Sequence, residues 1–151
     1  MRESKNAAIS GRVCLIEPDA LRRVVYQRHL RSLGHTVILD SLPFVAKVGD
    51  VDEVPFAVIA DLSGDRRRPT ETLAALRRRF PSTPSILLLG TEQSIAASDA
   101  LASGVCAMLH DPIRLEELEL HLARCMRGRR TRVRRPDANA QCAIAANTEG
   151  T

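Results

Sequence analysis

Short runs of apolar residues alternate along the chain with longer segments in which apolar residues recur every three or four positions. Continuous apolar runs of four or five residues are typical of parallel strands that are buried on both faces of a sheet. The pattern therefore predicts five strands joined by helices. The predicted strands are Val13–Ile16, His35–Leu39, Phe56–Ala60, Ile86–Leu89 and Ala107–His110.

The segments between these runs have the periodicity of amphipathic helices. Asp19 is placed to cap the first helix, and Gly34 follows its last apolar residue, as expected of a residue that ends a helix. The predicted helices are Leu21–Leu33, a weak one over Pro43–Val48, Thr70–Phe80, Glu92–Ser103 and Leu115–Arg127. The stripe that we expect to face the core in the first helix is Leu21, Val24, Val25, Leu30 and Leu33. Alternating strands and helices predict an α/β fold with a parallel sheet that is covered on both faces.

The chain of 151 residues is long enough for one domain. We expect a short N-terminal extension over residues 1–11, a domain over residues 12–127 and a basic, disordered tail over residues 128–151. The net charge of +4 is local, because without seven arginines near the C-terminus 15 basic residues face 18 acidic ones. These arginines are Arg124, Arg127, Arg129, Arg130, Arg132, Arg134 and Arg135.

Several classes of protein are disfavoured by what the sequence lacks. No apolar run approaches the roughly 20 residues of a membrane span, and no secretory signal is visible. The four cysteines have neither CxxC spacing nor a histidine partner at a metal-ligand spacing. The chain contains no Gly-rich phosphate loop and no evident pair of a nucleophile and a base. We therefore expect a cytoplasmic protein that is not an enzyme, with Cys14 as a buried thiol in the first strand.

Acidic residues follow two of the predicted strands. Asp61 ends the third strand, Glu17 follows the first, and Asp19 lies two positions further on. Because ligands of open α/β sheets bind beyond the carboxyl ends of the strands, this placement suggests a site for a cation or a phosphoryl group. Taken alone, Asp61 is better explained as a strand-end carboxylate that only caps nearby backbone amides.

The element order, together with Glu17, Asp61 and the His110-Asp111-Pro112 turn, resembles the receiver domains of bacterial two-component response regulators. The resemblance covers about residues 12–127 and implies a flavodoxin-like sheet of order 2-1-3-4-5, with the first and fifth helices on one face. It also implies that Asp61 accepts a phosphoryl group from a histidine kinase, with Mg²⁺ held by acidic residues that include Glu17.

The sequence departs from this family at most of the positions that support phosphorylation. Pro18 stands where a second acidic residue belongs, so that Asp19 would have to replace it through a shifted turn. Asp111 stands at the lysine position, which adds a negative charge beside Asp61. We therefore expect a degraded phosphorylation site, little Mg²⁺ binding and an acidic pocket without a basic partner.

Two further positions of the family pattern have lost their usual side chains. The hydroxyl position falls at Leu89 or Gly90, and the switch aromatic corresponds to Met108. We expect the conformational relay that depends on these side chains to be absent.

The function that this resemblance implies is that of a stand-alone, atypical receiver module in a phosphorelay, without an output domain of its own. It would bind a protein partner, such as a histidine kinase or a downstream regulator, or a second copy of itself. The expected surface is formed by the fourth helix, the fifth strand and the fifth helix.

An alternative is a small nucleic-acid-associated protein that binds through the arginine-rich segment from Arg124 to Arg135. Such binding would weaken steeply with salt, because each phosphate contact releases condensed counterions. Neither a helix-turn-helix, a zinc finger nor an aromatic stacking platform is evident for reading a base sequence.

Overall fold

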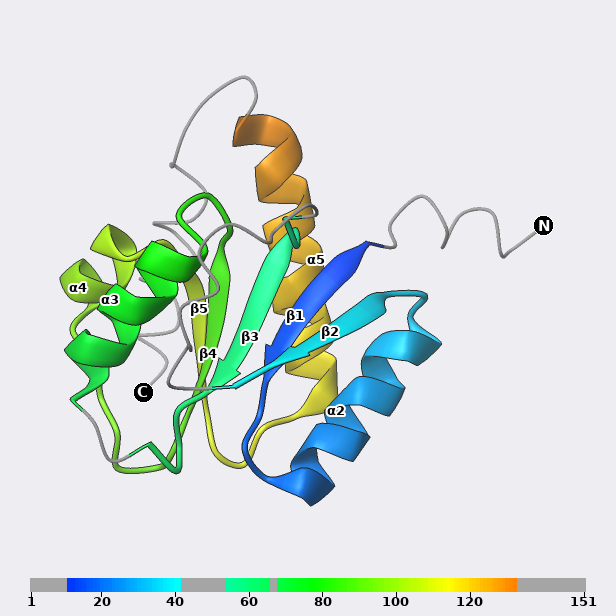
Figure 1. Cartoon of the computed structure of the whole chain (residues 1–151), viewed down its shortest axis with the longest axis horizontal. Coiled ribbons are helices and arrows are strands. Elements are labelled where there is room, and N and C mark those ends of the chain that lie inside the picture. The colour runs from blue at the N-terminus through cyan, green and yellow to red at the C-terminus, as the bar shows by residue number, and fades with distance from the viewer. Residues whose placement is uncertain (1–10, 42–53, 66–67, 133–151) are drawn as a thin grey trace.

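Five parallel strands form the centre of the computed structural model, which describes residues 11–41, 54–65 and 68–132 (Figure 1). The strands lie in the order β2-β1-β3-β4-β5, which confirms the predicted topology. Their bounds are β1 (Arg12–Ile16), β2 (Thr36–Asp40), β3 (Ala57–Asp61), β4 (Ser85–Leu89) and β5 (Val105–His110). All residues of β3 and β4 are buried, as the apolar runs predicted.

Helices cover both faces of this sheet, with bounds α2 (Ala20–Ser32), α3 (Pro69–Arg79), α4 (Ala97–Ala102) and α5 (Leu115–Arg132). Alternate residues of each strand point to opposite faces. Val13 and Ile59 join the core beneath α2 and α5, whereas Cys14 and Val58 join the core beneath α3 and α4. The first and last helices thus share one face, as expected. No helix within the described residues is both long and apolar enough to cross a membrane.

The ends of α2 follow the predicted signals. The Asp19 side chain accepts hydrogen bonds from the backbone amides of Leu21 (2.9 Å) and Arg22 (3.1 Å), and so caps the helix. Gly34 has a φ of 91°, a left-handed conformation that glycine adopts without steric cost. The cap fixes where the helix begins and therefore which residues lie in its first turn.

The core-facing side of α2 differs from the predicted stripe. Leu21 is 81% exposed, and Val24 and Val25 are each about half exposed, whereas Tyr26 and Leu30 are buried. Of the predicted stripe, Leu30 is confirmed as a core residue, whereas the prediction of Leu21, Val24 and Val25 as core residues was wrong. Position 22 lies on the same helix face as positions 26 and 30, because residues four apart are neighbours on a helix. Packing Tyr26 and Leu30 against the sheet turns Arg22 toward the carboxyl ends of the strands.

Two other helix boundaries differ from expectation. The predicted helix over Glu92–Ser103 forms only from Ala97 to Ala102, because Gln93 uses its side chain to bind the loops around it. The last helix continues to Arg132 instead of ending at Arg127, so residues 128–132 are helical and not part of a disordered tail. The expected Pro43–Val48 helix, residues 1–10 and residues 133–151 lie outside the described residues.

A disulfide joins Cys106 of β5 to Cys125 of α5, and both residues are buried in the core beneath α2 and α5. The sequence did not reveal this pairing. Cys14 is a free, buried thiol, and burial raises its pKa to about 12. It therefore stays protonated and packs as a small apolar group, as expected.

Candidate functional site

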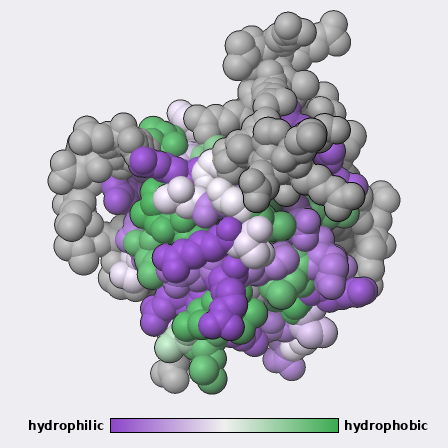
Figure 2. Space-filling model, turned by 90° about the vertical axis from the view of Figure 1, so that its right-hand side faces the viewer, coloured by the Kyte–Doolittle hydropathy of each residue, from purple (hydrophilic) through white to green (hydrophobic). Residues whose placement is uncertain are grey.

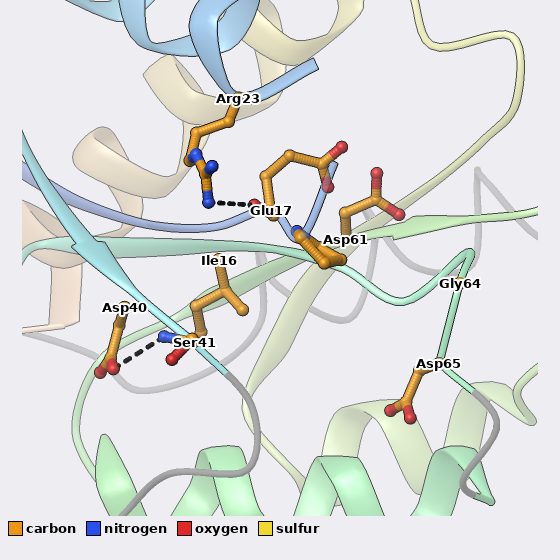
Figure 3. A pocket seen from close by; sticks show the side chains of 9 residues that line it. Ile16, Glu17, Arg23, Asp40, Ser41, Asp61, Gly64 and Asp65 are labelled. Atoms are coloured by element: carbon orange, nitrogen blue, oxygen red, sulfur yellow. Dashed lines mark hydrogen bonds between the residues drawn. The ribbon is translucent and has the colours of Figure 1, made fainter. Parts of the chain in front are cut away.

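Three acidic side chains from different strand ends meet at the carboxyl edge of the sheet. Glu17 follows β1, Asp61 ends β3 and Asp111 follows β5. Glu17 and Asp61 are each only 2% exposed, and the Asp111 side chain is 22% exposed. Figure 3 shows the carboxyl groups of Glu17 and Asp61 side by side in a pocket that Asp40 and Asp65 also line. The prediction that Glu17, Asp61 and Asp111 converge is met.

Both oxygens of the Asp61 carboxylate are engaged by neighbouring groups. Oδ1 accepts hydrogen bonds from the backbone amide of Ser63 (2.8 Å) and from its hydroxyl (2.6 Å). Oδ2 accepts one from Nη1 of Arg22 (3.3 Å). The interpretation of Asp61 as a local cap is therefore partly correct, since the turn after β3 is held by its carboxylate.

Arg22 is a basic partner of this cluster, which the sequence analysis did not foresee. Its Nη1 lies 3.3 Å from Asp61 Oδ2, 3.4 Å from Asp111 Oδ1 and 3.4 Å from the Ser63 hydroxyl. The expected acidic pocket without a basic partner is therefore wrong. The sequence could have indicated this partner, because position 22 lies on the same helix face as Tyr26 and Leu30. The incorrect assignment of Leu21, Val24 and Val25 to the core pointed to a different face.

Glu17 is the least compensated group of the cluster. Neither of its carboxyl oxygens has a hydrogen-bond partner, although the Asp61 carboxyl lies beside it (Figure 3). Burial and, to a smaller extent, the adjacent Asp61 carboxyl group together raise the pKa of Glu17 to about 9. Glu17 is therefore protonated at neutral pH.

The other predicted site residues lie around this edge and add no positive charge to it. Leu89 is buried at the end of β4, and the Gly90 amide donates to the Gln93 side chain (2.7 Å). Met108 is a buried core residue of β5. Asp19 caps α2 with its carboxylate. A cation for Asp61 comes instead from the helix after β1.

These residues do not fit a ready site for a divalent cation. Mg²⁺ requires nearly octahedral oxygen ligation and is usually held by one or two carboxylates with waters and substrate oxygens. Here both oxygens of the Asp61 carboxylate already accept hydrogen bonds, from Arg22 and from Ser63. Within residues 11–41, 54–65 and 68–132, no three histidine, cysteine or acidic side chains are grouped to hold a metal ion.

Gln93 connects the loops beyond β3, β4 and β5, a role that no sequence pattern indicated. Its Nε2 donates to the carbonyl of Leu62 (2.6 Å), and its Oε1 accepts from the amide of Gly90 (2.7 Å). Nε2 of His110 lies 3.1 Å from the Gln93 carbonyl oxygen. These contacts lie beside Gly90, one of the two positions at which the family pattern would place a hydroxyl side chain.

Only part of the arginine-rich segment from Arg124 to Arg135 falls within the described side chains. Arg124 and Arg127 are exposed on α5, whereas the side chains of Arg129, Arg130 and Arg132 and all of Arg134 and Arg135 lie outside. Nucleic-acid binding through this segment stays a prediction.

The described residues have the fold of response regulator receiver domains. A response regulator receiver domain protein from Clostridium thermocellum superposes with a TM-score of 0.65 at 16% identity, over 82% of this chain and 98% of that one. A CheY-like receiver domain protein from Methanospirillum hungatei gives a TM-score of 0.64 at 16% identity, over 81% and 98%. NtrX from Brucella abortus gives 0.65 at 17% identity, over 82% of this chain but only 29% of the NtrX chain.

No protein-family model matches the chain, and no curated protein matches its sequence. At such low identities the structural likeness establishes the fold, and the function must be argued from the site.

Proposed function

We propose that this chain is an atypical receiver module of a phosphorelay that acts by binding another protein and not by catalysis. Asp61 is its candidate phosphoacceptor, in a site that has lost most of its usual supports. The observation that carries the proposal is the position of Asp61, buried at the carboxyl end of the central strand β3 between Glu17 and Asp111.

The chemistry of the site argues for slow phosphorylation. In the transfer, an oxygen of Asp61 would bond to phosphorus while the bond from phosphorus to the donor breaks. Such a reaction needs metal ions or fixed cations to neutralise the developing charge. Here both Asp61 oxygens are engaged, and the lysine position holds Asp111. Arg22 is the one cation in contact with Asp61 among the described residues.

A direct test is to incubate the protein with acetyl phosphate and Mg²⁺ and to measure the phosphorylated fraction by intact mass spectrometry. We expect little modification of the wild type and none of Asp61→Asn. Asp111→Lys should raise the rate by about tenfold, less than the 10²–10³ of a well-placed donor, because its ammonium group would face Arg22. Rapid, stoichiometric labelling of wild-type Asp61 would show that the site is intact.

The surface that we propose for partner binding is the exposed face of α2. Leu21, Val24 and Val25 are exposed there, whereas α4 carries no large exposed apolar side chain among its described residues. Figure 2 shows the side of the molecule on which α2 lies, where hydrophobic and strongly hydrophilic residues adjoin. Residues 20–32 include no acidic residue, and Arg28 and Arg31 are exposed on this helix. Charge complementarity therefore favours an acidic helix with an apolar stripe as the partner.

This surface can be tested with a designed helical peptide that carries a leucine stripe flanked by glutamates. We expect amide shift changes in ¹⁵N-labelled protein to concentrate on α2, and Leu21→Ser to weaken binding by about tenfold, since burying a leucine contributes roughly 1.5–3 kcal/mol. Leu120→Ser on α5 and Asp61→Ala are the matched controls and should bind like the wild type. Changes confined to α4, β5 and α5 would favour the originally expected surface instead.

A further inference from the structure

The carboxylate cluster carries its own cation, held in place by the fold. Arg22 lies one helical turn after the Asp19 cap and on the same face as the buried Tyr26 and Leu30. The cap sets the start of α2, and the two buried side chains set its rotation. The guanidinium group of Arg22 is thereby directed at Asp61 and Asp111, and the contacts that direct it do not depend on a bound ion.

Arg22 compensates two acidic groups of the cluster by direct contact. These groups are Asp61 and Asp111, which lie on the carboxyl edge of the sheet beside Glu17. The guanidinium group lies between them, within 3.4 Å of a carboxylate oxygen of each. A divalent cation that approached the buried Asp61 carboxylate would therefore meet a positive charge at close range. The Arg22 side chain is 42% exposed, so that solvent screens part of this repulsion.

We propose that Arg22 is a built-in cation that takes the place of a divalent metal ion at Asp61 and excludes that ion from the site. This inference rests on the proposed function, since it explains one loss in the phosphorylation site. Arg22 acts as a positioning residue that holds Asp61 and Asp111 together. Without it, three carboxyl groups share one edge of the sheet with no compensating charge in contact with Asp61, which is the condition that favours a bound cation.

The neighbouring arginine supplies a matched control. Nη1 of Arg23 lies 3.4 Å from the backbone carbonyl oxygen of Glu17 and makes no described contact with Asp61 or Asp111 (Figure 3). Arg23→Gln removes the same formal charge from the same helix as Arg22→Gln. A difference between the two variants therefore reports the contact with the carboxylates and not the net charge of the protein.

The experiment is a titration of the wild type, Arg22→Gln and Arg23→Gln with Mn²⁺, followed by electron paramagnetic resonance of the free ion. We expect Arg22→Gln to bind Mn²⁺ at least about tenfold more tightly than the wild type, since a nearby like charge has been removed. Arg23→Gln should gain much less than Arg22→Gln, because Arg23 lines the same pocket but makes no described contact with Asp61 or Asp111. Asp61→Asn in the Arg22→Gln background should abolish the gain, which locates the ion. Equal affinities of Arg22→Gln and Arg23→Gln would overturn the inference.

If Arg22→Gln fails to fold, which circular dichroism would reveal, Arg22→Lys provides a second test. It retains the charge and should keep Mn²⁺ affinity near that of the wild type, so a tenfold gain in Arg22→Lys would equally overturn the proposal. Phosphorylation by acetyl phosphate separates the two ideas. If the wild type is not phosphorylated and Arg22→Gln does not bind Mn²⁺ more tightly, only the role of Arg22 is contradicted. Efficient labelling of the wild type contradicts the degraded phosphorylation site of the proposed function, whatever the affinity for Mn²⁺.

Discussion

At about pH 8.5, Glu17→Gln should unfold at a higher urea concentration than the wild type, with the difference disappearing near pH 4.5. The pKa of Glu17 is raised from 4.5 to about 9 in the folded protein, mainly by burial. Above pH 4.5 the unfolded chain releases this proton while the folded protein retains it. The folded state therefore loses up to about 1.4 kcal/mol of stability per pH unit until the folded pKa is reached.

Glutamine has no proton to release, so the variant escapes this loss. The free energy of unfolding of Glu17→Gln relative to the wild type should rise steadily from pH 4.5 to 9, by several kcal/mol as an order of magnitude. Glu116→Gln, on the exposed part of α5, is the control and should show no such trend. Parallel stability curves for Glu17→Gln and the wild type would mean that Glu17 is ionised in the folded protein at neutral pH.

Leu118→Ala should lower the free energy of unfolding by about 2–5 kcal/mol, as expected for a leucine removed from a packed core. Leu118 is 0% exposed and joins the cluster that fixes α5 to the sheet. Leu120→Ala on the same helix should cost no more than about 0.5 kcal/mol, since Leu120 is 46% exposed. Urea unfolding followed by circular dichroism measures both. Similar losses for the two variants would indicate that α5 packs with a different face.

The positions of the strands and of Asp61 could be predicted because both depend on local sequence. Buried parallel strands appear as apolar runs, and the residue that follows such a run lies at the edge of the sheet. The convergence of Glu17, Asp61 and Asp111 follows from the parallel arrangement alone. Family resemblance supplied the strand order.

The rotation of α2 could not be predicted in the same way, because its sequence offers two competing apolar faces. One contains Leu21, Val24 and Val25, and the other contains Tyr26 and Leu30. The choice between them depends on contacts with the sheet and on the ion pairs of Arg22, which lie far away in the sequence. The role of Gln93 is missed for a similar reason, since its partner Leu62 is 31 positions away.

The disulfide between Cys106 and Cys125 turns the end of β5, the following loop and the first part of α5 into a covalent ring. Arg114 lies exposed in this ring, between Asp111 and the start of α5. Proteolytic cleavage after Arg114 would open the ring without dividing the molecule, because the cross-link still joins the two pieces. The severed helix would remain at high effective concentration beside the sheet and dock again, as tethered binding partners do. A nick at the loop that carries Asp111 would then separate the two pieces only after a reductant had acted.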